Sequence, residues 1–386
     1  MSQISDGHDN NNKNEPPTIP HGDSLHAPPP FLPFELIIEI LSRVPVKSLI
    51  QFKCVCKSWK TLISDPQFAK KHLSTIQHNH HNHHLLLSMN DTLDNMIFGS
   101  YSLQSIFETS PPISTQVSYP FNTQNCFDLM VGSCDGMLCF AVNKSCALLW
   151  NPTIRVFKKL PPLEEYTIYG FGFDQCSDSY KVVAILRHEY YSDDESAWVT
   201  EVKVHNLGTD SWRTIQGCPS GIPTGFSATF VSGTLNWLAS NDPDLSSYAI
   251  VSLDLGKESC QELLQPDYRE VAVLSFNLGV LKNCLSIIVH YEEGSSDIWL
   301  MNDYGKKESW TKFLCLPYLG SPNLFPYGRV ICIYEDDEVL LELHSELAIY
   351  NFRNGTFKVP EIPGFSHLSG WPVPRIYVES LVSPCS

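Results

Sequence analysis

The segment that decides the architecture of this chain is FLPFELIIEILSRVPVKSLIQFKCVCKSWKTLI, residues 31 to 63. Apolar residues in its first half recur at the spacing of one face of an amphipathic helix. They are Leu36, Ile37, Ile40, Leu41 and Val44. Pro33 suits the first turn of that helix, and Pro45 ends it. Helical spacing continues to residue 63, and Asp65 with Pro66 begins a fourth segment that runs to residue 73.

This segment carries more apolar surface than so small a unit can bury. Nineteen of its 33 residues are apolar, against 43% of the whole chain, although a unit below roughly 70 to 80 residues rarely builds a self-sufficient core. We therefore expect residues 31 to 73 to form a small all-α module of three to four helices. Part of its apolar surface should be covered by another protein.

Beyond residue 84, short alternating strands bounded by Gly, Pro, Asn and Asp replace the helical periodicity. One pattern recurs five times: a strand ends in Asn or Asp, a tight turn follows, and an aromatic residue six positions later opens another strand. The markers are Asn151, Asn206, Asp254, Asn302 and Asn351. Their separations of 55, 48, 48 and 49 positions are close to the roughly 50-residue period of kelch-type propeller blades. The fourth unit has two extra residues, and the third has Cys260 in place of the aromatic.

These repeats predict an all-β propeller-like domain over residues 85 to 382, with six blades as the preferred count. Residues 84 to 109 supply strands without a first strand of their own, and residues 374 to 382 form a lone strand. The two ends of the domain would together make one blade and close the ring, which removes exposed sheet edges. Seven blades or a distorted sandwich are the alternatives.

The remaining segments are expected to be tails and a linker. Residues 1 to 30 contain no aromatic residue and are rich in Asn, Pro, Asp and Ser, so a disordered tail is predicted. Residues 74 to 84 form a His-rich linker whose histidines lack carboxylate or Cys companions, and residues 383 to 386 form a short tail. Gly22-Asp23-Ser24-Leu25 has the letters that open one family of serine esterases, but it lacks a preceding strand and a histidine partner.

The net charge of −16 is unevenly distributed: residues 1 to 30 carry −3, residues 31 to 73 carry +4 and residues 74 to 386 carry −17. An acidic large domain argues against nucleic-acid binding, and it favours encounter with basic partners. No segment has the length of apolar sequence that a bilayer requires, and no signal peptide is recognised. The 13 cysteines contain no zinc-type CxxC pair, and Cys54 and Cys56 are expected to be small core residues. A reduced cytoplasmic or nuclear setting is predicted.

The helical module resembles the F-box. The family's Leu-Pro, Ile-Leu-x-x-Leu/Val-Pro and Val-Cys-Lys-x-Trp elements are matched without a gap by Leu32 and Pro33, by Ile40, Leu41, Val44 and Pro45, and by Val55, Cys56, Lys57 and Trp59. The resemblance implies binding to a Skp adaptor, which links the chain to cullin and RING subunits and so to ubiquitin transfer. An ordinary helical subdomain packed on the rest of the chain is the alternative.

The β region resembles the plant F-box-associated domain. The resemblance is carried by 132–139 (GSCDGMLC), 150–153 (WNPT), 170–174 (GFGFD), 180–183 (YKVV), 297–299 (DIW) and 309–312 (SWTK), in family order. On their own, these motifs are typical of a scaffold, with glycine and asparagine at turns and tryptophan packed between blades.

Together these features predict a substrate-recognition subunit of a Skp-cullin-F-box ubiquitin ligase. The expected adaptor-binding residues, some of which must form the module's own core, are Leu32, Pro33, Leu36, Ile37, Ile40, Leu41, Val44, Pro45, Leu49, Phe52, Val55, Cys56 and Trp59. The protein target is not identified by the sequence, although the charge balance suggests a basic one.

We expect no catalytic residue, no metal and no cofactor. The chain has no Gly-rich phosphate loop, no HExxH and no GxSxG motif. Two rival functions remain open at this stage. One is a propeller enzyme, and the other is an adaptor-bound scaffold that does not lead to ubiquitin transfer.

Overall fold

The structure is a computed structural model of the 386-residue chain. It describes residues 32–77, 82–90, 96–117, 129–142, 145–163, 167–192, 195–219, 221–240, 242, 247–269, 271–317, 329–335, 337–343, 346–362 and 374–385. The predicted N-terminal tail, with its Gly-Asp-Ser-Leu tetrapeptide, lies outside the described residues, as do His78, His80 and His81.

Four helices form the N-terminal module: α1 (Phe34–Leu41), α2 (Val46–Phe52), α3 (Lys57–Ile63) and α4 (Pro66–Ile76). Pro33 and Pro45 lie at the N-caps of α1 and α2, so Pro45 starts the second helix after the first has already ended. The Asp65 carboxylate caps α4 by accepting hydrogen bonds from the backbone N–H groups of Gln67 (2.7 Å) and Phe68 (3.1 Å). The helical prediction is confirmed.

The rest of the described chain is almost entirely β-structure. The first part contains β1 (His83–Asn90), β2 (Met96–Ser102), the helix α5 (Leu103–Glu108), β3 (Ser114–Val117), β4 (Leu129–Cys134), β5 (Met137–Val142), β6 (Cys146–Asn151) and β7 (Val156–Lys159). The middle part contains β8 (Thr167–Asp174), β9 (Ser179–Ser192), β10 (Glu195–Asn206), β11 (Arg213–Ile215), β12 (Ile222–Val231), β13 (Thr234–Ser240), β14 (Ala249–Asp254) and β15 (Ser259–Leu263). The last part contains β16 (Val273–Leu281), β17 (Cys284–Tyr291), β18 (Ser296–Met301), the 3-10 helix η2 (Lys307–Ser309), β19 (Trp310–Leu316), β20 (Arg329–Tyr334), β21 (Glu338–Leu343), β22 (Glu346–Asn351), β23 (Thr356–Lys358) and β24 (Arg375–Val378). His83 and His84 therefore begin β1 rather than extend the linker.

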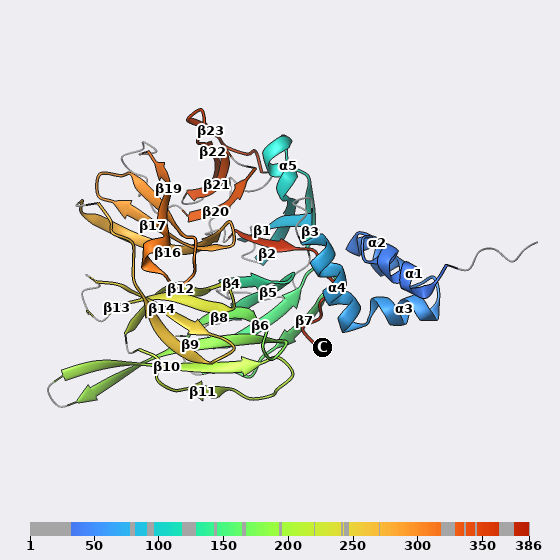
Figure 1. Ribbon diagram of the computed structural model, residues 1–386, viewed down its shortest axis with the longest axis horizontal. Coiled ribbons are helices and arrows are strands. Elements are labelled where there is room, and N and C mark those ends of the chain that lie inside the picture. The colour runs from blue at the N-terminus through green and yellow to red at the C-terminus, as the bar shows by residue number, and fades with distance from the viewer. Residues whose placement is uncertain are drawn as a thin grey trace, which may run out of the picture.

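These strands form a ring of sheets (Figure 1). Within the described residues, four sheets have four strands each, in the orders β24-β1-β2-β3, β4-β5-β6-β7, β16-β17-β18-β19 and β20-β21-β22-β23. A fifth sheet has the order β11-β10-β9-β8-β12-β13-β14-β15. Its two halves meet through one parallel bridge, where Tyr169 of β8 lies opposite Ser227 of β12.

The C-terminal strand pairs with the first strand of the domain, as predicted. β24 runs antiparallel to β1, with Ile376 opposite Leu85. The strand is shorter than the predicted 374–382, because the chain beyond Glu379 turns toward a neighbouring sheet. There the Asn151 side-chain amide donates hydrogen bonds to the carbonyl oxygens of Ser380 (3.1 Å) and Val382 (2.8 Å).

The Asn or Asp marker of the sequence repeat shapes the turn between the last two strands of a sheet. Asn151, Asp254 and Asn351 end β6, β14 and β22. In each case the side-chain Oδ1 accepts hydrogen bonds from the backbone N–H groups two and three residues later, over 2.9 to 3.4 Å. Short Asn and Asp side chains are suited to this turn, which explains why these residue types recur.

Apolar clusters lie between successive groups of strands around the ring. In order, they pack β1–β2 against β4–β6, β4–β6 against β8–β9, β9–β10 against β13–β14, β13–β14 against β17–β18, β17–β18 against β21–β22, and β21–β22 against β1–β2. Trp150 and Trp237 are almost completely buried in two of these clusters. Each sheet therefore buries both of its faces against its neighbours.

Two of the aromatic markers of the repeat, Trp212 and Trp310, tie their unit to the preceding one. The indole N–H of Trp212 donates a hydrogen bond to the carbonyl oxygen of Pro161, in the loop after β7 (2.9 Å). The indole N–H of Trp310 makes the equivalent bond to Leu264, directly after β15 (2.9 Å). Each bond joins the start of the last strand in one unit to the loop that follows the last strand of the preceding unit.

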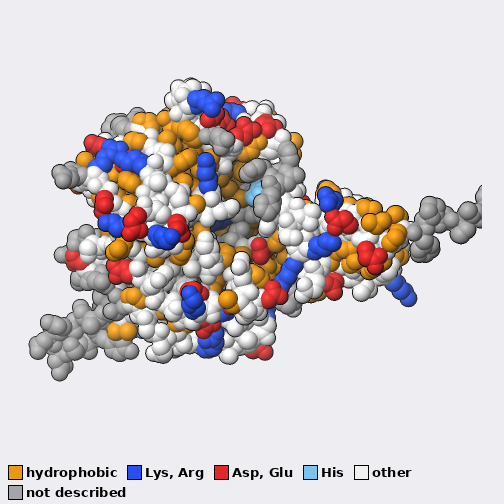
Figure 2. Space-filling view, in the orientation of Figure 1, with side chains coloured by type: hydrophobic (Ala, Val, Ile, Leu, Met, Phe, Trp, Pro, Cys, Tyr) orange, Lys and Arg blue, Asp and Glu red, His pale blue; other side chains and the backbone are white. Residues whose placement is uncertain are grey.

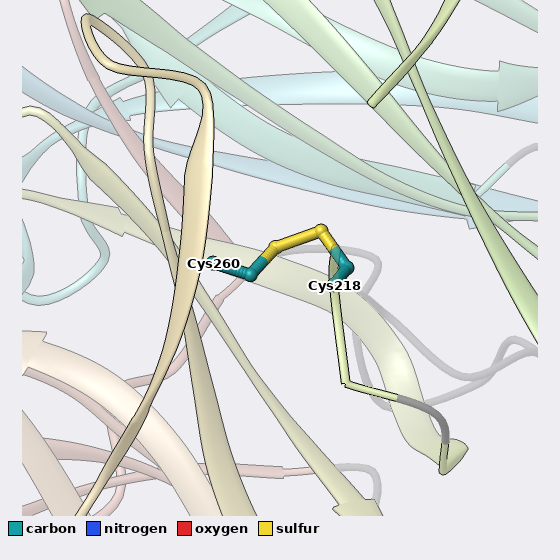
Figure 3. Close-up of a disulfide and its surroundings, with 2 residues drawn as sticks. All are labelled: Cys218 and Cys260. Carbon is teal, nitrogen blue, oxygen red and sulfur yellow. A yellow bond between two sulfur atoms is a disulfide. The ribbon is translucent and has the colours of Figure 1, made fainter. Parts of the chain in front are cut away.

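A disulfide occupies this position where the aromatic residue is missing. Cys260 of β15 is bonded to Cys218, in the loop after β11, with a Cα–Cα distance of 4.9 Å (Figure 3). This disulfide was not predicted from the sequence, because packing brings together residues 42 positions apart. Cys54 and Cys56 are also exposed, not core residues, because they lie in the turn between α2 and α3.

Candidate protein-docking site

An exposed apolar set on the helical module is the main feature of the candidate site. It consists of Leu32 (52% exposed), Leu36 (49%), Ile40 (52%) and Val55 (62%), together with exposed Pro33, Pro45 and Cys56. Leu36 and Ile40 are neighbours on one face of α1, since they lie four residues apart. Hydrophobic side chains gather toward the end of the module that lies away from the β domain (Figure 2). Large apolar groups left in water mark surfaces that bind other proteins.

The other predicted adaptor-binding residues contribute to the core of the module. Leu41 and Leu49 are buried, and Ile37, Val44, Phe52 and Trp59 are partly buried against the same cluster. The rings of Phe52 and Trp59 pack with their centroids 5.5 Å apart. The structure thus divides the thirteen predicted residues into seven that face solvent and six that support the helices.

The sequence interpretation missed Phe34, which is half exposed at the first position of α1. It directly follows the Leu32-Pro33 pair that marks the start of the module. This position was the signal in the sequence that could have added Phe34 to the predicted docking residues. Its exposure adds an aromatic side chain to the apolar residues around α1, and aromatic residues are enriched at the centres of protein interfaces.

Charged and polar groups border the exposed apolar set. The Glu39 carboxylate on α1 pairs with Arg43 (2.6 Å) and Lys71 (3.1 Å). Hydrogen bonds from Arg43 and then from Lys71 lower the pKa of Glu39. The Ser58 hydroxyl lies 3.1 Å from the Cys56 sulfur and lowers the pKa of this thiol. These contacts place charged and polar side chains beside the exposed apolar set, and a polar rim next to an apolar centre is the usual layout of a binding interface.

The helical module is joined to the β domain by a continuous apolar core. Ala69, Leu73 and Ile76 of α4 belong to the same cluster as Tyr180 of β9 and Leu381 near the C-terminus. A contact between such buried groups fixes the orientation of the two units, because closely packed interiors resist deformation.

Polar contacts reinforce this junction. Lys70 of α4 forms an ion pair with Asp178 (2.5 Å), and its ammonium lies 5.4 Å from the centre of the Phe173 ring. The Tyr180 hydroxyl donates a hydrogen bond to the Asp135 carboxylate (2.8 Å). A cavity of about 210 Å³ remains between α4, the turn before β9 and the C-terminal segment.

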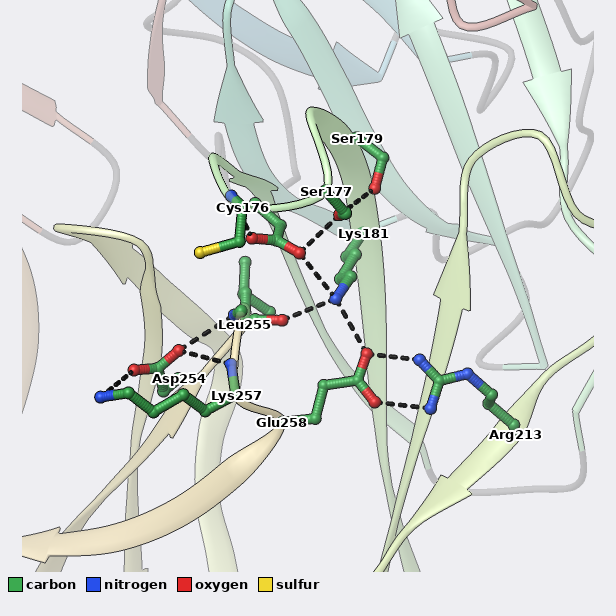
Figure 4. A network of polar contacts seen from close by, with 11 residues as sticks. Cys176, Ser177, Ser179, Lys181, Arg213, Asp254, Leu255, Lys257 and Glu258 are labelled. Atoms are coloured by element: carbon green, nitrogen blue, oxygen red, sulfur yellow. Dashed lines mark hydrogen bonds and ion pairs between the residues drawn. The ribbon is translucent and has the colours of Figure 1, made fainter.

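A polar network inside the eight-stranded sheet brings acidic and basic side chains together, as a catalytic cluster would (Figure 4). The Lys181 ammonium contacts the carboxylates of Asp174 (2.9 Å) and Glu258 (2.8 Å) and the carbonyl oxygen of Leu255 (2.6 Å). Arg213 forms a two-point ion pair with Glu258. Every charge in this network has an opposite partner, and it links β9, β11 and the β14–β15 turn. We therefore interpret it as a structural tie between two units.

Burial and hydrogen bonding act in opposite directions on the pKa values of this network. Burial raises the pKa of Asp174, but hydrogen bonds from Ser177 and Lys181 outweigh it and leave that pKa below its ordinary value. The pKa of Glu258 is also lowered, first by its hydrogen bond with Arg213. The pKa of Lys181 is raised, because its carboxylate partners outweigh the effect of burial. All of these groups therefore keep their charges near neutral pH.

Within the described residues, no group of three or more His, Cys, Asp or Glu side chains is arranged to hold a metal ion. No helix in the described part of the chain is long and apolar enough to cross a membrane.

Comparisons with known proteins identify the class. Residues 30–71 match the model of the F-box domain, and residues 84–384 match the model of the F-box associated beta propeller domain. The chain belongs to the family of F-box proteins that carry this β-propeller domain.

Relatives from Arabidopsis thaliana support the assignment along 92% of the chain. An F-box/kelch-repeat protein is 32% identical over 377 residues, which covers 92% of this chain and 96% of the relative. The F-box protein CPR1 is 27% identical over 385 residues, with 92% of this chain and 89% of the relative covered. A solved structure of oligogalacturonate lyase in complex with manganese aligns with a TM-score of 0.40 and 12% identity, over 76% of this chain and 90% of that chain.

Proposed function

We propose that this chain is the substrate-recognition subunit of a Skp-cullin-F-box ubiquitin ligase. The observation that carries the proposal is the exposed apolar set, which remains in water although the module has its own buried core. The F-box family membership implies a Skp adaptor as the partner that covers this set. The adaptor links the chain to cullin and RING subunits, and catalysis takes place on those partners, so the chain itself is not an enzyme.

The adaptor contact in this proposal divides between two kinds of residue. Leu32, Pro33, Leu36, Ile40, Pro45, Val55 and Cys56 touch the adaptor directly. Ile37, Val44, Phe52 and Trp59 contribute their exposed edges, whereas Leu41 and Leu49 act by holding the helices in place. In this proposal residues 31 to 73 form the adaptor-binding module, which α4 extends to Ile76, and residues 85 to 382 form the target-binding β domain, which β1 extends back to His83.

We further propose that the β domain has six blades. The eight-stranded sheet would count as two blades, because a single parallel bridge joins its halves. The six apolar clusters then correspond to the six contacts between blades, and the β24–β1 pairing closes the ring.

The β domain binds the protein target in this proposal, in the cytoplasm or the nucleus. Its charge of −17 over residues 74 to 386 favours a basic target. Electrostatic steering predicts that target binding weakens as salt rises from about 50 to about 300 mM. Binding that does not change over this range would contradict a basic target.

The adaptor assignment is tested by co-purification. Leu32→Ala with Pro33→Ala removes two exposed residues at the start of the module, and we expect adaptor co-purification to be lost while the chain stays folded. Undiminished recovery of the adaptor would contradict the proposal. The half-life of a bound partner protein distinguishes the ligase subunit from the scaffold alternative. Removal of this chain should lengthen that half-life only if binding leads to degradation.

A further inference from the structure

The centre of the ring encloses a cavity of about 400 Å³. It is lined by residues of β4, β8, β12, β16, β20 and β24, the strands that lie nearest the ring axis, and by a few residues of the next strands. Cavities of roughly 300 to 1,000 Å³ with a few polar groups are typical of sites for small molecules. The size of this one is therefore compatible with a ligand of modest size.

The charged part of the cavity lies away from the helical module. Arg375 is the first residue of β24, and the chain that leaves the other end of this strand reaches Leu381, which packs in the cluster shared with α4. Arg329 is likewise the first residue of β20, and it lines the same cavity. A ligand at these residues would not compete with the helical module for space.

Among the described residues that line this cavity, positive charge exceeds negative charge. Its charged lining residues, within the described part of the chain, are Arg329, Glu342 and Arg375. Arg329 and Glu342 lie directly opposite each other on β20 and β21. One carboxylate can balance only one of the two guanidinium groups. Burial, with the nearby charge of Arg329 as a second cause, lowers the pKa of Arg375 to about 10.

Two polar atoms at the cavity have no hydrogen-bond partner in the structure. They are Oε2 of Glu342 and the hydroxyl oxygen of Ser275, and both are buried. An unsatisfied buried polar atom is costly, and it often marks a place that a ligand or water completes. Burial raises the pKa of Glu342, and the nearby charges of Arg329 and Arg375 oppose this effect.

We propose that the central cavity binds a small molecule bearing a carboxylate or phosphate group. Its oxygen atoms would accept hydrogen bonds from the guanidinium groups of Arg329 and Arg375, which are suited to planar, two-point recognition of oxyanions. The Ser275 hydroxyl would donate another. Such a ligand would balance the extra positive charge of the cavity. This inference does not depend on the ubiquitin-ligase proposal, because it concerns the β domain alone.

Citrate and inorganic phosphate serve as probes, with glycerol as an uncharged control at constant ionic strength. Calorimetry on the full chain should show saturable binding of at least one oxyanion and none of glycerol. Arg375→Gln should weaken that binding roughly tenfold or more. Arg353→Gln is the matched control, because its side chain is 77% exposed and pairs with Asp337 at the surface. This control should leave binding unchanged.

Glu342→Gln should change the affinity for the oxyanion in the direction opposite to Arg375→Gln. This second variant keeps the inference testable if Arg375→Gln does not fold. Removal of the only carboxylate in the described cavity lining should tighten oxyanion binding. Absence of binding by both probes would overturn the inference. It would also be overturned if Arg375→Gln and Arg353→Gln had equal effects, or if Glu342→Gln weakened binding, because the anions would then bind outside the cavity.

Discussion

The double change Leu36→Ala with Ile40→Ala should break adaptor binding without unfolding the chain. The two side chains are 49% and 52% exposed. Complete burial of a Leu or Ile side chain is worth about 1.5 to 3 kcal/mol, so burial of the exposed half contributes about 1 kcal/mol each. Loss of both therefore costs about 2 kcal/mol of binding free energy, or roughly a 30-fold rise in Kd. The helix itself should persist, because Ala is the best helix former.

The assay is calorimetric titration of the purified chain with a purified Skp adaptor, combined with chemical denaturation of each variant. Leu264→Ala is the matched control, since it truncates an exposed leucine on the β domain, and its Kd should equal that of the unchanged chain. Leu41→Ala should instead lower the free energy of unfolding by about 2 to 5 kcal/mol, because Leu41 is buried. A folded Leu36, Ile40 double variant with unchanged Kd would refute the proposed role of the exposed apolar set.

Further predictions concern the ties within the β domain. Lys181→Met should lower the free energy of unfolding by about 3 to 5 kcal/mol, because it leaves Asp174 buried without its cation. Lys257→Met, at a side chain that is 79% exposed, should change it by less than about 0.5 kcal/mol. Because the pKa of Asp174 is lowered in the folded state, its contribution is present above about pH 4 and lost as the pH falls further. Denaturation at a series of pH values should show this decline, and the decline should be smaller in the Lys181→Met variant. Equal declines in the two proteins would contradict this origin. Cys218→Ser should lower the free energy of unfolding by up to about 4 kcal/mol under oxidising conditions, because the disulfide closes a separation of 42 residues. After reduction the substitution should have no effect. A non-reducing mass spectrum without the linked peptides would contradict the disulfide.

The helical module was predictable because its signals are local. Proline positions, the Asp65 cap and apolar spacing all act over a few residues, and they define four helices. The exposure of individual side chains on these helices was not predictable from the same pattern. Leu36 and Leu41 have the same residue type in the same helix, yet Leu36 is half exposed and Leu41 is buried. That difference depends on how α1 packs against the other helices.

The β repeat was predictable because its turn chemistry recurs. Asn151, Asp254 and Asn351 accept the same two backbone hydrogen bonds, so the residue type is constrained at each turn. The disulfide was not predictable in this way. Cys260 stands where the other units have an aromatic residue, but nothing local connects it to Cys218.

The polar groups of the central cavity were also missed. Arg329, Glu342 and Arg375 lie on three strands, and no sequence spacing links Arg375 to the other two. Only closure of the ring brings them into one cavity.

Hydrogen–deuterium exchange of the full chain, with and without purified Skp adaptor, tests the central claim most directly. The proposal predicts slower exchange on binding in α1 and in the segment from residue 53 to 59, with unchanged exchange in the strands of the β domain. No protection in α1, or protection confined to the β domain, would contradict the assignment of the exposed apolar set as the adaptor-docking surface.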